Sequence, residues 1–110
     1  MAKLERRLSG EFDSLLDRIH TGILSGSMSA SYEDGSDWQV EDVRVATRVY
    51  ERYSWFGSNR VSLSVTLAAR GKDMFLTAIT SGGSQAVFFK INTLGESEFL
   101  RKLEEVLDSL

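Results

Sequence analysis

The 110-residue sequence predicts a single α+β domain, residues 1–110, in which two helices cover one face of a single antiparallel β-sheet. Two segments, one near each end of the chain, carry apolar residues at helical spacing, and the segments between them alternate apolar and polar residues. Glycine-containing turns separate the alternating segments, as is typical of hairpins. We expect about five or six strands in the order β-α-β-β-β-β-β-α, with both helices on one face.

The two helices are predicted from apolar residues three and four positions apart. In the first helix this pattern runs from just after Ser9 to Leu24, and Gly26 is expected to end it. The second helix opens with Thr93 and Glu96, which have the spacing of a capping box, and continues nearly to the C-terminus. Each helix has one apolar stripe, and each stripe needs an apolar surface to cover.

The strands are predicted from alternation with a period of two. Two long segments in the middle of the chain alternate strictly, whereas the two that follow are apolar almost continuously. The expected strands are 3–8, 27–33, 43–53, 60–70, 73–80 and 85–92. Residues 34–37 are predicted to form a loop, with Trp38 leading into the next strand.

The turns set the register of the last three expected strands. Gly71 with Lys72, and Gly82 with Gly83, fit two-residue hairpin loops. The first loop places Leu67 opposite Leu76, and the second places Leu76 opposite Phe89. The predicted helix-facing set is Val45, Val49, Leu63, Val65, Leu67, Met74, Leu76, Ala78, Val87, Phe89 and Ile91.

The opposite face of the sheet, which we call the helix-free face, is the first candidate functional surface. An exposed antiparallel face is normally polar, but this one is predicted to be half apolar. Such a face indicates a partner or a ligand, unless the N-terminal strand or the Trp38 loop folds across it. The candidate ligand or interface residues are Arg48, Tyr50, Arg52, Phe75, Ile79 and Phe88, beside Arg44.

No motif combines a nucleophile, a base and an orienting group, so we expect no enzymatic activity and no cofactor. His20 is the only histidine and cysteine is absent, which excludes paired-histidine and thiolate metal sites. The acidic residues at 33–42 lack the spacing of a calcium loop, so no metal is predicted. The loop of Ser81, Gly82, Gly83 and Ser84 could cradle a phosphate, but it joins two expected strands, which favours an ordinary hairpin.

The composition is that of a soluble globular protein, with a net charge of −3 and 42% hydrophobic residues. No apolar stretch approaches the roughly 20 residues needed to span a bilayer, and the N-terminus carries no targeting signal. We therefore expect a cytoplasmic protein that does not bind a membrane. Although arginines share a strand with Tyr50, the negative net charge disfavours nucleic acid as a partner.

Three segments, 49–54, 59–63 and 80–90, resemble a family of small bacterial proteins classed as a domain of unknown function. The resemblance covers most of the chain and implies a bacterial, cytoplasmic setting but no activity. The expected order of elements is also similar to helix-grip folds and to halves of TATA-binding-protein-like folds. An analogy at the level of fold assigns no function.

Two hypotheses of function follow from the sequence. The first is a non-enzymatic interaction or assembly protein that self-associates through the helix-free face as a homo-oligomer, with a dimer favoured. The alternative is a small-ligand-binding module with a pocket between the sheet and the C-terminal helix. In that module an arginine would hold the charged group of an apolar anionic molecule.

Overall fold

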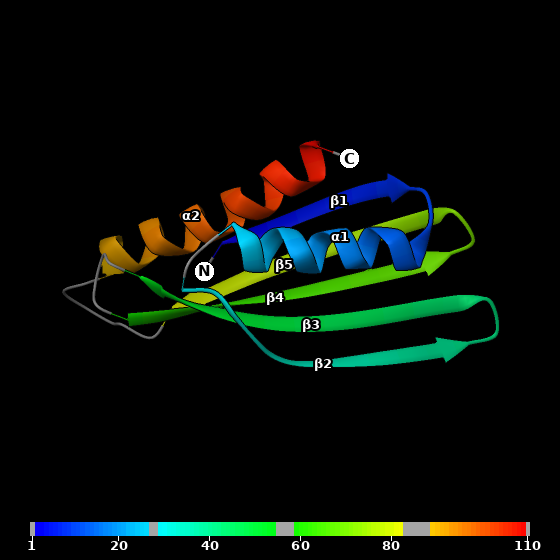
Figure 1. The fold of residues 1–110 in the computed structure, drawn as a ribbon, viewed down its shortest axis with the longest axis horizontal. Helices are drawn as coiled ribbons and strands as arrows, with labels where there is room; N and C mark the ends of the chain where they lie inside the picture. Colours follow the sequence, from blue (N-terminus) through cyan, green and yellow to red (C-terminus); the bar gives the residue numbers. More distant parts are fainter. Residues whose placement is uncertain (1, 27–28, 55–58, 83–88, 110) are drawn as a thin grey trace.

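A computed structural model describes residues 2–26, 29–54, 59–82 and 89–109. It contains one five-stranded antiparallel sheet with the strand order β1-β5-β4-β3-β2, and both helices pack on the same face (Figure 1). The elements are β1 (Lys3–Ser9), α1 (Phe12–Ser25), β2 (Ser31–Val40), β3 (Val43–Ser54), β4 (Asn59–Arg70), β5 (Asp73–Gly82) and α2 (Phe89–Asp108). The predicted α+β class is confirmed.

The register of β4 and β5 is the one that the turn chemistry predicts. Leu67 lies opposite Leu76, and Val65 lies opposite Ala78. Gly71, the first residue of the connecting turn, has a φ of 62°, a conformation that glycine adopts without the steric cost of a Cβ. The turn therefore fixes which side chains of both strands face the helices.

The predicted orientation of β3 is wrong. Ala46 and Tyr50 are fully buried on the helix side, opposite Leu67 and Leu63, whereas Val45 and Val49 lie on the helix-free face. Valines alternate here with arginines, and hydrophobicity alone favours the valines as the buried set. Arginine stems, however, can cover apolar surface while their charged ends reach polar partners. This strand therefore turns its arginines toward the helices.

The expected strand at 85–92 is wrong where the structure describes it, because Phe89 already begins α2. Residues 83–88, including Gly83, lie outside the described residues. The second neighbour of β5 is the N-terminal strand β1, which places Leu8 opposite Met74 and Arg6 opposite Leu76. A short apolar run is compatible with either a buried strand or a buried helix, and periodicity alone does not distinguish them.

Strand β2 also differs from its expected range. It spans Ser31–Val40 and includes the expected loop at 34–37. Its pairing with β3 shifts register between Tyr32 and Asp34, which marks a bulge. Most of its side chains are exposed on both faces, and this explains why it lacks the apolar alternation by which strands are recognised.

The core lies between the two helices and the sheet. Apolar side chains of α1 and α2 interlock with those of β3, β4 and β5 in one cluster. The helical members of that cluster are Phe12, Leu15, Ile19, Ile23, Phe99, Leu100, Leu103 and Leu107. Where the helices approach each other, a Cβ added at Gly22 would overlap the side chain of Val106. Gly22 therefore sets how closely α1 and α2 pack.

Replacing Gly22 with alanine should destabilise the protein by about 1–3 kcal/mol, because the added methyl group overlaps Val106. In an open helical position the same change would stabilise the helix by up to about 1 kcal/mol. Urea unfolding measures the difference. In a Val106→Ala background the cost of Gly22→Ala should largely vanish. An increase in stability for Gly22→Ala alone would contradict the close packing of the two helices.

Candidate functional site

The centre of the helix-free face carries no charge. Between the charged residues near the strand ends, twelve outward side chains of the three central strands are small, hydroxylated or apolar. They are Val43, Val45, Thr47, Val49, Ser62, Ser64, Thr66, Ala68, Phe75, Thr77, Ile79 and Ser81. Phe75 and Ile79 are 45% and 40% exposed, so large apolar groups face solvent on β5, the strand between the central β4 and the edge strand β1.

Charged residues are confined to the margins of this face. At one end of the strands Glu51 pairs with Arg60 at 2.9 Å. At the other end and along β1, Arg7 donates two hydrogen bonds to the Asp73 carboxylate, and these bonds lower the pKa of that carboxyl. On the β2 side, Trp38 is 61% exposed and lies opposite Val45. An uncharged centre within a charged rim is the composition of a protein interface.

Neither segment that could have covered the helix-free face does so within the described residues. The N-terminal residues form the edge strand β1, and Trp38 lies within the opposite edge strand β2 (Figure 1). Phe75 and Ile79 occupy the face as the sequence indicates. Ser81 ends the same row, and its hydroxyl lies 2.9 Å from that of Ser62.

The remaining candidates lie elsewhere. Arg48, Tyr50 and Arg52 are on the helix side of β3, which corrects their placement on the helix-free face. Gly82 is the last residue of β5. Phe88, Gly83 and Ser84 fall outside the described residues.

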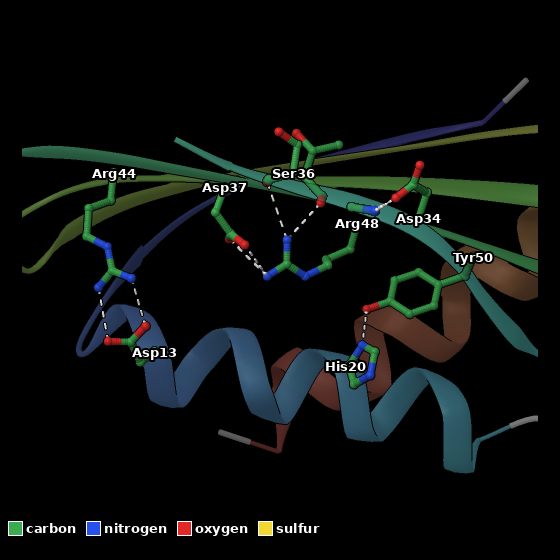
Figure 2. A network of polar contacts seen from close by, with 10 residues as sticks. Asp13, His20, Asp34, Ser36, Asp37, Arg44, Arg48 and Tyr50 are labelled. Atoms are coloured by element: carbon green, nitrogen blue, oxygen red, sulfur yellow. Dashed lines mark hydrogen bonds and ion pairs between the residues drawn. The ribbon is translucent and has the colours of Figure 1, made fainter. Parts of the chain in front are cut away.

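A second polar region lies between α1 and the β2–β3 hairpin (Figure 2). The Arg48 side chain is only 17% exposed, and its guanidinium donates to the Asp37 carboxylate at 2.9 Å and to the Thr47 carbonyl at 2.9 Å. A Cβ at Gly35 would lie 2.9 Å from Arg48 Cδ and 2.6 Å from Tyr32 Oη. The missing side chain of Gly35 makes room for Arg48 to cross β2.

His20 and Tyr50 meet beside this arginine. His20 Nδ1 and the Tyr50 hydroxyl share a hydrogen bond of 2.8 Å, and the Tyr32 ring completes a cluster with centroid separations of 5.2 to 5.8 Å. Burial raises the pKa of Tyr50 to about 12, so its hydroxyl stays protonated at neutral pH. The sequence predicts only a partly exposed histidine at this position. Once Tyr50 faces α1, the two residues can meet.

The cations of this region are neutralised by the chain itself. Arg44 donates two hydrogen bonds to the Asp13 carboxylate, which lower the pKa of that carboxyl, and its guanidinium stacks 4.3 Å from the Phe12 ring. Arg48 is likewise held by Asp37. A groove of about 390 Å³ remains between α1 and β2, next to His20 and Tyr32. Its ion pairs and hydrogen bonds connect α1 to the hairpin, and its two described arginines, Arg44 and Arg48, are both bound to carboxylates.

Metal ligands do not converge in the part of the chain that the structure describes. No group of three histidine or acidic side chains there could hold a metal ion. Among the described residues, no helix is both long enough and apolar enough to cross a membrane.

Comparison with known proteins gives one match. The model of a family of unknown function, DUF6054, matches residues 1–110. The chain belongs to this family. Membership of DUF6054 confirms the resemblance to a domain-of-unknown-function family. Because the function of the family is unknown, membership assigns no activity to this chain. No curated protein and no solved structure gives a significant match. For this DUF6054 member, the surfaces of the fold are therefore the basis from which a function is inferred.

The buried Tyr50 hydroxyl should make stability fall at alkaline pH. Its pKa is raised from 10.0 to about 12, so between these values the folded protein keeps a proton that the unfolded chain loses. Stability is therefore fully present below about pH 10 and decreases as the pH rises toward about 12. Urea unfolding at a series of pH values measures the slope.

Tyr50→Phe removes the ionisable hydroxyl and should flatten that alkaline slope, although it also removes the hydrogen bond to His20. Tyr32→Phe serves as the control, since it changes a neighbouring exposed tyrosine and leaves Tyr50 in place. Equal alkaline slopes for the wild type and Tyr50→Phe would rule out this explanation.

Proposed function

We propose that this protein is a non-enzymatic assembly protein whose copies pair through the helix-free face. The observation that carries the proposal is the exposure of Phe75 and Ile79 on β5, between the uncharged side chains of β4 and the charged side chains of β1. Exposed apolar patches of this kind on soluble proteins mark interaction sites. The proposal includes a cytoplasmic setting in a bacterial cell. The absence of cysteine from the chain is compatible with that reducing compartment.

The size of the face suits a stable dimer. Strands about 4.8 Å apart and about ten residues long give a five-stranded face of about 24 by 33 Å, or about 800 Å². A standard protein interface buries about 800 Å² on each partner. Two such faces can stack with their strands about 30° apart, as in β-sandwiches.

The arrangement of large and small side chains on the helix-free face favours a second copy of the same chain as the partner. Phe75 lies beside Ala68 on the neighbouring strand, and Ile79 lies beside Ser64. Each large side chain is therefore next to a small one, so that a protrusion and a hollow occupy adjacent positions. A two-fold axis brings the same surface of both copies together, which lets each protrusion of one copy enter a hollow of the other.

Phe75→Asp should dissociate the dimer, because the contact would bury an unpaired carboxylate. We expect the dissociation constant to rise by at least about 30-fold, which is the effect of losing a central contact worth about 2 kcal/mol. Sedimentation velocity over a concentration series measures this constant, and circular dichroism checks that the variant is folded.

Tyr32→Asp is the matched control, since Tyr32 has a similar exposure of 44% but lies beside α1, away from the helix-free face. This variant should remain dimeric. A wild-type protein that stays monomeric at high concentration, or equal weakening by both substitutions, would disprove the proposal.

A further inference from the structure

The two edge strands of the helix-free face carry opposite charge. On β1 the outward side chains are Lys3, Glu5, Arg7 and Ser9, which lie opposite the outward residues of β5. On β2 they include Asp34, Ser36 and Trp38, which lie opposite the outward residues of β3. Asp34 and Ser36 point away from α1 (Figure 2). The β1 edge is therefore basic, whereas the β2 edge is acidic and carries an exposed indole.

Corresponding positions of the five strands form rows across this face. Each row runs from β2 to β1 and has its smallest side chain on β4, with a valine of β3 on one side and a large apolar side chain of β5 on the other. One row consists of Trp38, Val45, Ala68, Phe75 and Arg7. Another consists of Asp34, Val49, Ser64, Ile79 and Lys3.

A two-fold axis between two stacked copies can run along the strands or across them. An axis across the strands places each strand against its own copy, so that the basic β1 edges face each other and so do the acidic β2 edges. An axis along β4 exchanges the edges, so that β1 of one copy faces β2 of the other. Facing charges of the same sign oppose association, and facing charges of opposite sign favour it. The charges of the two edges therefore favour the axis along β4.

The sizes of the side chains favour the same axis. With the axis along β4, Phe75 faces the partner's Val45, and Ile79 faces the partner's Val49. Each large side chain of β5 then meets a smaller one of β3, and both sides of the axis are filled alike. An axis across the strands would place the large side chains of β5 against each other and the valines of β3 against each other, which would hold the two sheets at unequal distances.

We propose that two copies pair about an axis along β4, with Arg7 over the partner's Trp38 and Lys3 beside the partner's Asp34. The inference rests on the proposed assembly through the helix-free face and adds its orientation. Arg7 donates Nε and Nη2 to Asp73 in the plane of its guanidinium, which leaves the flat face of that group available to an indole. The indole of Trp38 is 61% exposed.

The arginines at the two ends of β4 do not oppose this axis. Arg60 and Arg70 would each lie near their own copy. Arg60 is paired with Glu51, and Arg70 is paired with Asp42, each at 2.9 Å. Each end of the axis therefore carries an internally neutralised pair.

Single-cysteine variants test the direction of the axis, because the chain has no cysteine of its own. Ala68→Cys and Ser64→Cys place a thiol at two outward positions of β4, about 13 Å apart along the strand. On an axis along β4 both positions face their own copies, so a short bismaleimide should crosslink each variant with itself. Denaturing gel electrophoresis measures the covalent dimer.

An axis across the strands can bring only one of these two positions onto itself. Crosslinking of one variant alone, or only of a mixture of the two, would therefore overturn the proposal. Asp17→Cys is the control, since Asp17 is exposed on α1, on the other side of the sheet. This variant should not crosslink at the same protein concentration.

Charge reversal at the edges gives a second readout. Asp34→Lys should raise the dissociation constant of the dimer by about 3- to 10-fold at low salt, because both of its contacts with Lys3 become repulsive. Lys3→Glu should have the same effect, and the double variant should restore most of the affinity because the charges are exchanged. Asp17→Lys is the matched control and should leave the constant unchanged. Sedimentation velocity measures all four variants.

A tighter dimer for Lys3→Glu is the result that an axis across the strands requires, and it would reject the proposed orientation. These outcomes are distinct from failure of the assembly itself. A wild type that stays monomeric would disprove both proposals. A dimer that Phe75→Asp dissociates, but in which Ala68→Cys and Ser64→Cys do not both crosslink with themselves, would retain the assembly and reject its axis.

Discussion

The pairing of β4 with its two neighbours is the constraint on which the rest of the structure depends. β4 is the central strand of the sheet, and its odd-numbered residues from Val61 to Ala69 are buried beneath the helices. A shift of one residue would turn that whole row toward the other face. The same register decides the identity of both surfaces. It leaves the middle of the helix-free face without charge, and it brings the arginines of β3 under the helices.

The sequence predicts what depends on local signals. The α+β class and the β4–β5 register follow from alternation and from the turn at Gly71, both of which act over a few residues. The orientation of β3 cannot be predicted from local signals. It depends on whether the arginines of this strand can pair with carboxylates on other elements. Asp13 lies far from Arg44 along the chain, and Asp37 is separated from Arg48 by the turn between β2 and β3. No rule of sequence spacing predicts either pair.

The sequence predicts the residues of the helix-free face better than it predicts those on the helix side of β3. Phe75 and Ile79 belong to a strand whose register is set by its turn, so their place on the helix-free face can be deduced from sequence. The contact between His20 and Tyr50 joins a helix to a strand and depends on the orientation of β3. Arg52 can be named as a ligand candidate from its residue type. Only the three-dimensional surroundings show that its Nε and Nη1 are buried, with no hydrogen-bond acceptor among the described residues.

The bulge in β2 bears on how large an assembly can become. An edge strand with regular pairing groups can add a strand from another molecule, and repeated addition produces fibres. In β2 the register shift between Tyr32 and Asp34 and the surrounding carboxylates interrupt that edge. At the other edge, β1 is only seven residues long and alternates exposed charged side chains. Growth of the sheet at its edges is therefore opposed, which is compatible with the proposed contact between faces.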